Sequence, residues 1–133
     1  MRKLIAALAV TALALTGTVG QAKERKSGEE KLAELLKDRV PGEGKSCIST
    51  NRSDKLRVID ETAIVYDAGD TIWVNRTRDP KDLDWNDTLV IKRLSGSQLC
   101  KLDQITTVDR GSGFFSGIVF LEDFIPYRKV NAS

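Results

Sequence analysis

The stretch that decides the fold is Ala63-Ile64-Val65-Tyr66-Asp67-Ala68-Gly69-Asp70-Thr71-Ile72-Trp73-Val74-Asn75. Its two ends are rich in β-branched and aromatic residues, which favour strands. The four residues between them are typical of a tight turn, and Gly69 suits the positive φ that such a turn requires. The stretch therefore predicts a β-hairpin with strands over residues 63–66 and 71–75.

A helix is expected before this hairpin. Ser27 and Glu30 have the spacing of a capping box, in which the two side chains satisfy each other's free backbone amides at the start of a helix. Apolar residues then recur at three- and four-residue steps and predict one apolar stripe: Leu32, Leu35, Leu36 and Val40. Pro41 and Gly42 end the helix. We prefer packing of this stripe on the core to a role in binding a partner.

Further strands are expected on both sides of the hairpin. Residues 56–58 predict one strand before it, and residues 88–93, 104–109 and 117–120 predict three after it. Pro126 restricts any later strand to a sheet edge or a tail. One helix and five or six short strands indicate an α+β fold, with the N-terminal helix packed on a small, mostly antiparallel β-sheet that can curl into a barrel.

The chain begins with the layout of a secretory signal peptide. Two basic residues precede an apolar run over residues 4–15, and small residues continue to Gly20 and Ala22. The run is too short to span a bilayer, and it lacks the polar face of a buried helix, which is the alternative interpretation. We expect cleavage after Ala22 or Gly20, which gives a signal peptide over residues 1–22 and a single periplasmic domain over residues 23–133 without a transmembrane segment.

The balance of charge argues against nucleic-acid binding. The chain has 21 Lys and Arg residues and 19 Asp and Glu residues. Removal of the signal peptide takes away Arg2 and Lys3 and leaves 19 residues of each sign. A domain of zero formal net charge lacks the positive field that attracts nucleic acid or anionic membranes. We therefore expect no nucleic-acid partner.

Cys47 and Cys100 are the only cysteines. In an oxidising compartment their pairing is the expected state, and a bond between them would stabilise a domain of this small size. A redox site and a zinc site are the alternatives, but a redox pair is usually spaced as Cys-x-x-Cys, and zinc needs four ligands. We predict a structural Cys47–Cys100 disulfide, no metal ligands and no cofactor.

The chain contains no histidine, so Ser-His-Asp and Cys-His mechanisms are excluded within it. Catalysis by two carboxyl groups, as in glycoside hydrolysis, remains open. Five acidic residues are available for it, and no pattern selects a pair among them: Glu43, Asp60, Glu61, Glu122 and Asp123. We expect no enzymatic activity and no catalytic residue. A small carboxylate-dependent hydrolase acting on envelope glycans is the alternative.

The densest group of oxygen ligands is an acidic loop after the hairpin. Asp82, Asp84 and Asn86 fall at the first, third and fifth positions of an EF-hand loop. The pattern fails at the sixth position, where Asp87 replaces the required glycine, and at the twelfth, where Arg93 replaces the required glutamate. We interpret this segment as a solvated connecting loop and keep a calcium-stabilised module as a third hypothesis.

Aromatic side chains gather toward the C-terminus. The glycine-rich residues 111–117 are not followed by a helical pattern, so they predict a turn or wide loop rather than a phosphate-binding loop. Five aromatic residues can form either an exposed patch for a partner or part of the core: Phe114, Phe115, Phe120, Phe124 and Tyr127. We prefer the core.

Several short segments carry a resemblance to known proteins, namely residues 47–48, 59–60, 63–66, 73–76, 96–100 and 124–127. In these segments the chain resembles a group of small exported proteobacterial proteins and, more distantly, an uncharacterised domain family with two similarly placed cysteines. The resemblance covers most of residues 30–129. It implies a bacterial source, a periplasmic location and a Cys47–Cys100 bridge. The family has no established activity, so the resemblance implies no functional residue.

We expect a non-enzymatic periplasmic binding or structural module. This expectation rests on the predicted export, the predicted disulfide, the balanced charge and the lack of recognisable catalytic groups. The partner of the module would be an unknown protein or envelope component, bound through a face or an edge of the sheet.

Overall fold

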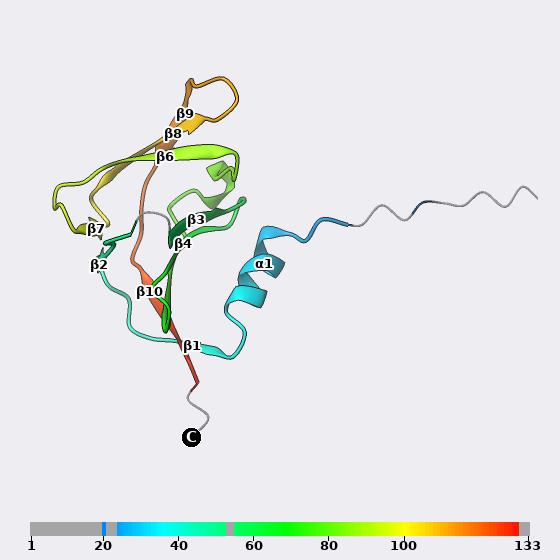
Figure 1. The fold of residues 1–133 in the computed structure, drawn as a ribbon, viewed down its shortest axis with the longest axis vertical. Helices are drawn as coiled ribbons and strands as arrows, with labels where there is room; N and C mark the ends of the chain where they lie inside the picture. The colour runs from blue at the N-terminus through cyan, green and yellow to red at the C-terminus, as the bar shows by residue number, and fades with distance from the viewer. Residues whose placement is uncertain (1–19, 21–23, 53–54, 131–133) are drawn as a thin grey trace, which may run out of the picture.

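The computed structural model describes residue 20 and residues 24–52 and 55–130 (Figure 1). The predicted signal peptide lies outside these ranges except for Gly20, so it stays a prediction. No helix in the described part of the chain has the length and apolar character needed to cross a membrane. The described residues form the helices α1 (Gly28–Leu35) and η2 (Pro80–Asp82) and the strands β1 (Arg39–Pro41), β2 (Cys47–Ser49), β3 (Leu56–Ile59), β4 (Ala63–Asp67), β5 (Thr71–Asn75), β6 (Asp87–Lys92), β7 (Gln98–Cys100), β8 (Gln104–Asp109), β9 (Phe115–Val119) and β10 (Ile125–Lys129).

The strands form three antiparallel sheets. The largest sheet has the order β1-β10-β5-β4-β3, the second has the order β6-β8-β9, and the third pairs β2 with β7. The predicted α+β fold with mostly antiparallel sheet is confirmed. Within the described residues the sheets stay open and do not close into a barrel.

The five-stranded sheet is the middle layer of the fold, with α1 on one side and β6, β8 and β9 on the other (Figure 1). β4 shows this arrangement most clearly. Ala63 and Val65 pack under α1 beside Leu32, whereas Ile64 and Tyr66 belong to the core between the two larger sheets. All four residues of β4 from Ala63 to Tyr66 are buried because both faces of the strand are covered.

The predicted hairpin is confirmed as β4 and β5. Gly69 has a φ of 91°, in the region that favours glycine. The N–H of Gly69 donates to Oδ1 of Asp67 at 2.9 Å, so the aspartate stabilises the turn locally.

The predicted capping box is also confirmed. The N–H of Glu30 donates to Oγ of Ser27, and the N–H of Ser27 donates to the Glu30 carboxylate. Gly28 begins α1 so close to the β3–β4 turn that a Cβ on it would lie 2.0 Å from Oγ1 of Thr62. The start of α1 is therefore determined by local hydrogen bonds and by a contact with the sheet.

The helix is shorter than the apolar stripe predicted. It ends at Leu35, and Asp38 then has a φ of 60°, which turns the chain back toward the sheet. Val40 lies in β1 and is 52 % exposed, so its assignment to the buried stripe was wrong. Pairing of β1 with β10 replaces the last helical turn.

Four strands were not predicted: β1, β2, β7 and β10. The first three have only three residues each, too few to show an alternating pattern. The restriction of Pro126 to an edge or a tail was wrong, because β10 lies between β1 and β5. Pro126 is tolerated there because β1 pairs with β10 only from Tyr127 onward.

Cys47 and Cys100 form the predicted disulfide, which joins β2 to β7. Their neighbours Ile48 and Leu99 are buried in the core between the two larger sheets. A structural disulfide of this kind is typical of an oxidising location, extracellular or periplasmic.

Candidate functional site

A groove separates the open edges of the two larger sheets. β3 is a terminal strand of the five-stranded sheet, and β6 is a terminal strand of the three-stranded sheet. Among the described residues, β3 pairs only with β4, and β6 pairs only with β8. The groove has a volume of about 430 Å³. Each of its two walls is therefore an edge strand, whose outer backbone groups have no partner strand.

The floor of the groove is apolar. Leu56 and Val58 come from β3, and Leu89 and Ile91 come from β6. All four side chains are half-buried and pack against the core between the sheets. Because this core supports them from below, the floor is preformed rather than assembled by a ligand.

Trp85 lies at the end of the groove where β6 begins, and its side chain is 60 % exposed. Its backbone N–H donates to Oδ1 of Asp60 at 3.2 Å, which ties the segment before β6 to the β3–β4 turn. At the same end, the hydroxyl of Ser116 donates to Oδ2 of Asp87 at 2.8 Å. The Trp85–Asp60 bond connects the two sheets at this end of the groove, whereas the Ser116–Asp87 bond links β9 to β6 within the three-stranded sheet.

Two arginines line the groove, Arg57 from β3 and Arg110 from the turn after β8. Both are exposed, and neither has an ion-pair partner among the described residues. Asp87 also lines the groove, and its carboxylate accepts the Ser116 hydrogen bond. The groove thus offers an apolar floor with two available positive charges.

A second concavity of about 450 Å³ lies beyond Trp85 and has an acidic lining: Asp60, Glu61, Asp82, Asp84, Asp87 and Asp109. Hydrogen bonds from Ser112 lower the pKa of Asp109. Glu29, on α1, also has a lowered pKa, because Arg76 donates hydrogen bonds to its carboxylate. A catalytic general acid needs the opposite shift, so these two groups do not suit that role.

The structure divides the five acidic residues considered for hydrolysis. Asp60 and Glu61 line the acidic concavity. Glu122 and Asp123 instead form ion pairs with Arg78 and Lys101. Glu43 is exposed in the loop after β1.

The acidic loop forms turns that local hydrogen bonds stabilise. The N–H of Asn86 donates to Oδ1 of Asp84 at 2.8 Å, and Asp82 ends the short helix η2. In residues 24–52 and 55–130, no three Asp, Glu, His or Cys side chains form a group that could hold a metal ion. The loop therefore connects β5 to β6 through local hydrogen bonds.

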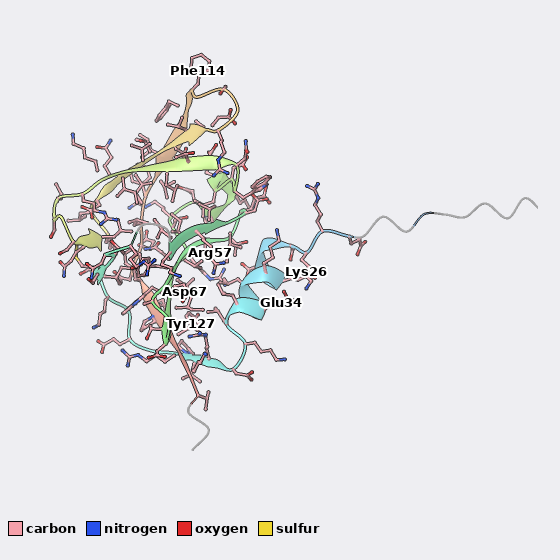
Figure 2. All side chains as sticks on the ribbon, in the orientation of Figure 1. Lys26, Glu34, Arg57, Asp67, Phe114 and Tyr127 are labelled. Carbon is pink, nitrogen blue, oxygen red and sulfur yellow. A yellow bond between two sulfur atoms is a disulfide. The ribbon has the colours of Figure 1, made fainter. Side chains whose placement is uncertain are left out.

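The C-terminal aromatic residues belong to two environments. Phe124 is buried in the core, and Tyr127 is half-buried under α1. Phe114, Phe115 and Phe120 are 76 %, 65 % and 50 % exposed. Figure 2 shows Phe114 at the far tip of the β8–β9 hairpin, away from α1. The preference for the core is correct for two of these residues and wrong for the other three.

Sequence reasoning did not find the groove. The sequence predicted strands over residues 56–58 and 88–93. No pattern in the sequence indicated that these two strands lie on opposite sides of one groove. Arg57 and Arg110 carry no motif, because their role depends on which strands lie nearby. Trp85 was seen only as part of an acidic loop.

Comparisons with protein-family models, with curated proteins and with solved structures found no match to this chain. The resemblance to small exported proteobacterial proteins therefore stays a prediction.

Proposed function

We propose that this chain is a non-enzymatic periplasmic binding module that holds an extended, acidic segment of a partner polypeptide in the groove between β3 and β6. The observation that carries the proposal is that two edge strands line one apolar groove. Binding of this kind would add a strand to an existing sheet.

The backbone geometry supports an extended ligand. An edge strand offers unpaired N–H and C=O groups to a peptide, and main-chain hydrogen bonds then supply affinity. Side chains of an added strand alternate between two directions. Every second residue of the ligand would meet the apolar floor formed by Leu56, Val58, Leu89 and Ile91, which favours apolar residues at those positions.

The charges support an acidic ligand. Arg57 and Arg110 line the groove from two different elements, and neither has an ion-pair partner among the described residues. Guanidinium groups bind carboxylates through two hydrogen bonds at once, which gives both orientation and affinity. Ligand residues that alternate with the apolar ones would therefore be acidic.

The location rests on two features. The first is the apolar run over residues 4–15, which predicts export. The second is the disulfide between the two cysteines, which is typical of an oxidising compartment. Intact-mass analysis of native material tests the location: a protein that retains residue 1, or that has two free thiols, would contradict export.

Binding can be tested with two labelled heptapeptides, one alternating Val and Glu and one alternating Val and Lys. Fluorescence anisotropy should give at least about tenfold tighter binding of the acidic peptide, because each of the two arginines contributes about 1 kcal/mol and about 1.4 kcal/mol corresponds to tenfold. Hydrogen exchange should show protection of backbone amides in β3 and β6 when the acidic peptide is bound.

The double variant Arg57→Glu/Arg110→Glu should reverse this preference. Arg128→Glu is a matched control, because Arg128 is an exposed arginine on β10 outside the groove. It should leave both affinities unchanged. Failure of both peptides to protect β3 or β6, or an equal response of the control and the double variant, would overturn the proposal.

A further inference from the structure

The three-stranded sheet has two different faces. The inner face carries Leu89 and Ile91 of β6, Ile105 of β8 and Val119 of β9, all in contact with the core. The register pairs Val90 with Thr106 and Thr106 with Ile118, so these residues share the opposite, outer face. Side chains alternate along a strand, and this assigns each residue of the sheet to one face.

The centre of the outer face is apolar, and its margins carry the exposed residues Thr88, Lys92 and Gln104. Val90 and Ile118 are 49 % and 45 % exposed at its centre. A bulge in β9 places Phe115 opposite Val108, on the same face. Phe120 follows β9 on this side and lines a shallow concavity with Leu102. We call this surface, made of Val90, Leu102, Phe115, Ile118 and Phe120, the outer apolar face.

The β9 edge of this sheet lacks the charged residues that normally prevent an edge strand from pairing with another chain. β9 is a terminal strand, and residues 111–121 contain no charged side chain. Edge strands of monomeric proteins normally carry charges or prolines that prevent pairing with another chain. An uncharged edge beside an exposed apolar face indicates a surface that is covered in the functional state.

We propose that a second copy of this chain covers the outer apolar face, so that two three-stranded sheets pack face to face in a symmetric dimer. Aligned packing of two sheets is a common geometry for antiparallel sheets and places them about 10 Å apart. The proposal rests on a surface other than the β3–β6 groove and is independent of the proposed function.

The area agrees with a dimer. The exposed fractions of the five side chains correspond to apolar area on the order of 500 Å², taking about 200 Å² for a whole aromatic side chain and less for an aliphatic one. A stable interface covers about 800 Å² on each partner, of which about 65 % is apolar in homodimers. The face therefore has about the apolar area that one subunit of a dimer contributes.

The charges around the face favour a second copy over an anionic membrane. At one end Arg78 and Lys101 form ion pairs with Glu122, and Lys101 also pairs with Asp123. Arg78 stacks over the ring of Phe120 at 5.1 Å. In a two-fold symmetric dimer, basic residues at the border of one subunit can pair with acidic residues at the border of the other. A membrane-binding face would instead have an excess of basic residues.

Sedimentation velocity of the full, oxidised chain over roughly 1–100 µM tests the proposal, since the dimer fraction should rise with concentration. Ile118→Glu places a charge at the centre of the face and should weaken dimerisation at least about tenfold. Val130→Glu is the matched control, because Val130 is an exposed apolar residue after β10 and outside the face. It should leave the dimer unchanged.

Hydrogen exchange of the unaltered chain at low and high concentration gives a test that needs no variant. Slower exchange in β9 at high concentration is expected. A chain that stays monomeric throughout, or a dimer that Ile118→Glu leaves intact, would overturn the proposal. Binding of the monomer to phosphatidylglycerol vesicles, with no dimer in solution, would overturn it in favour of a membrane surface.

Discussion

The two larger sheets use their apolar residues differently. The five-stranded sheet is covered on both faces, so β4 is buried from Ala63 to Tyr66. The three-stranded sheet is covered on one face, and β6 alternates between half-buried and exposed residues. Yet its exposed positions include Val90, and β9 adds Ile118. The difference indicates that the first sheet stabilises the fold, whereas the second has apolar surface left for a contact.

The largest expected effect separates two phenylalanines of these regions. Phe124 is 1 % exposed in the core, whereas Phe115 is 65 % exposed on the outer apolar face. Phe124→Ala should lower the free energy of unfolding by about 3–5 kcal/mol, because it leaves a cavity. Phe115→Ala should change it by less than about 0.5 kcal/mol in the monomer. Urea unfolding at low protein concentration measures both. Equal losses would remove the distinction between the two sheets.

The next effect concerns the disulfide between β2 and β7, which lies beside the core between the two larger sheets. Cys47 and Cys100 are 53 residues apart, and their bond limits the unfolded chain. The double variant Cys47→Ala/Cys100→Ala should lose about 2–4 kcal/mol of unfolding free energy.

A reducing agent is the control for this prediction. It should destabilise the unaltered chain by a similar amount and leave the double variant unaffected. If reduction has no effect on the unaltered chain, the bond is not a source of stability.

A smaller effect is expected at Asn75, which is fully buried at the end of β5. Its Nδ2 donates to the carbonyl of Glu122 at 2.6 Å, and its Oδ1 accepts from the N–H groups of Thr77 and Glu122 at 3.0 Å. Asn75→Asp replaces the donor with a carboxylate oxygen, which leaves that carbonyl unpaired and buries a charge, and this should cost about 1–3 kcal/mol or more. Thermal or urea unfolding measures the loss.

Asn51→Asp is the matched control, because Asn51 is exposed in the loop after β2. It should change stability by less than about 0.5 kcal/mol. A similar loss in both variants would mean that Asn75 does not connect β5 to the segment before β10.

The smallest effect is the attachment of α1 to the five-stranded sheet by Glu29 and Arg76. Arg76 donates to both carboxylate oxygens of Glu29, at 2.6 and 3.1 Å, and this lowers the pKa of Glu29 below its ordinary value of 4.5. The stabilisation is therefore present above pH 4.5 and is lost as the pH falls through the lowered pKa.

Glu29→Gln tests this ion pair. Since both side chains are largely exposed, the variant should lose only about 0.2–1 kcal/mol at pH 7 and nothing below the lowered pKa. Unfolding free energies at neutral and acid pH, with Arg76→Gln as the second arm, measure the difference. An equal loss at both pH values would assign the effect to helix packing instead.

Much of the fold could be predicted because its signals are local. The capping box at Ser27 and Glu30, the turn at Gly69 and the alternating residues of β6 and β8 each depend on neighbours within a few positions. The disulfide could be predicted because Cys47 and Cys100 were the only candidates.

The candidate site could not be predicted in the same way. Arg57 and Arg110 are far apart in the sequence and line one groove because β3 lies on one side of it, while the pairing of β6 with β8 brings the turn after β8 to the other side. The strands β1, β2 and β7 are too short to have a pattern, so each forms only where a partner strand is available. Val40 illustrates the same limit, because its helical spacing was overridden by the pairing of β1 with β10.

The amino-acid sequence alone determined the fold class, the helix start, the central hairpin and the pairing of the two cysteines. The first three follow from residues that are close in the sequence. The cysteine pairing follows because the chain has no third cysteine that could pair with either one. Only the tertiary structure decided which sheet faces are covered and which edges stay open, and therefore where the groove and the outer apolar face lie. The physical reason is that burial depends on which layers pack together, and a strand with apolar residues on both faces does not specify which of them solvent will reach.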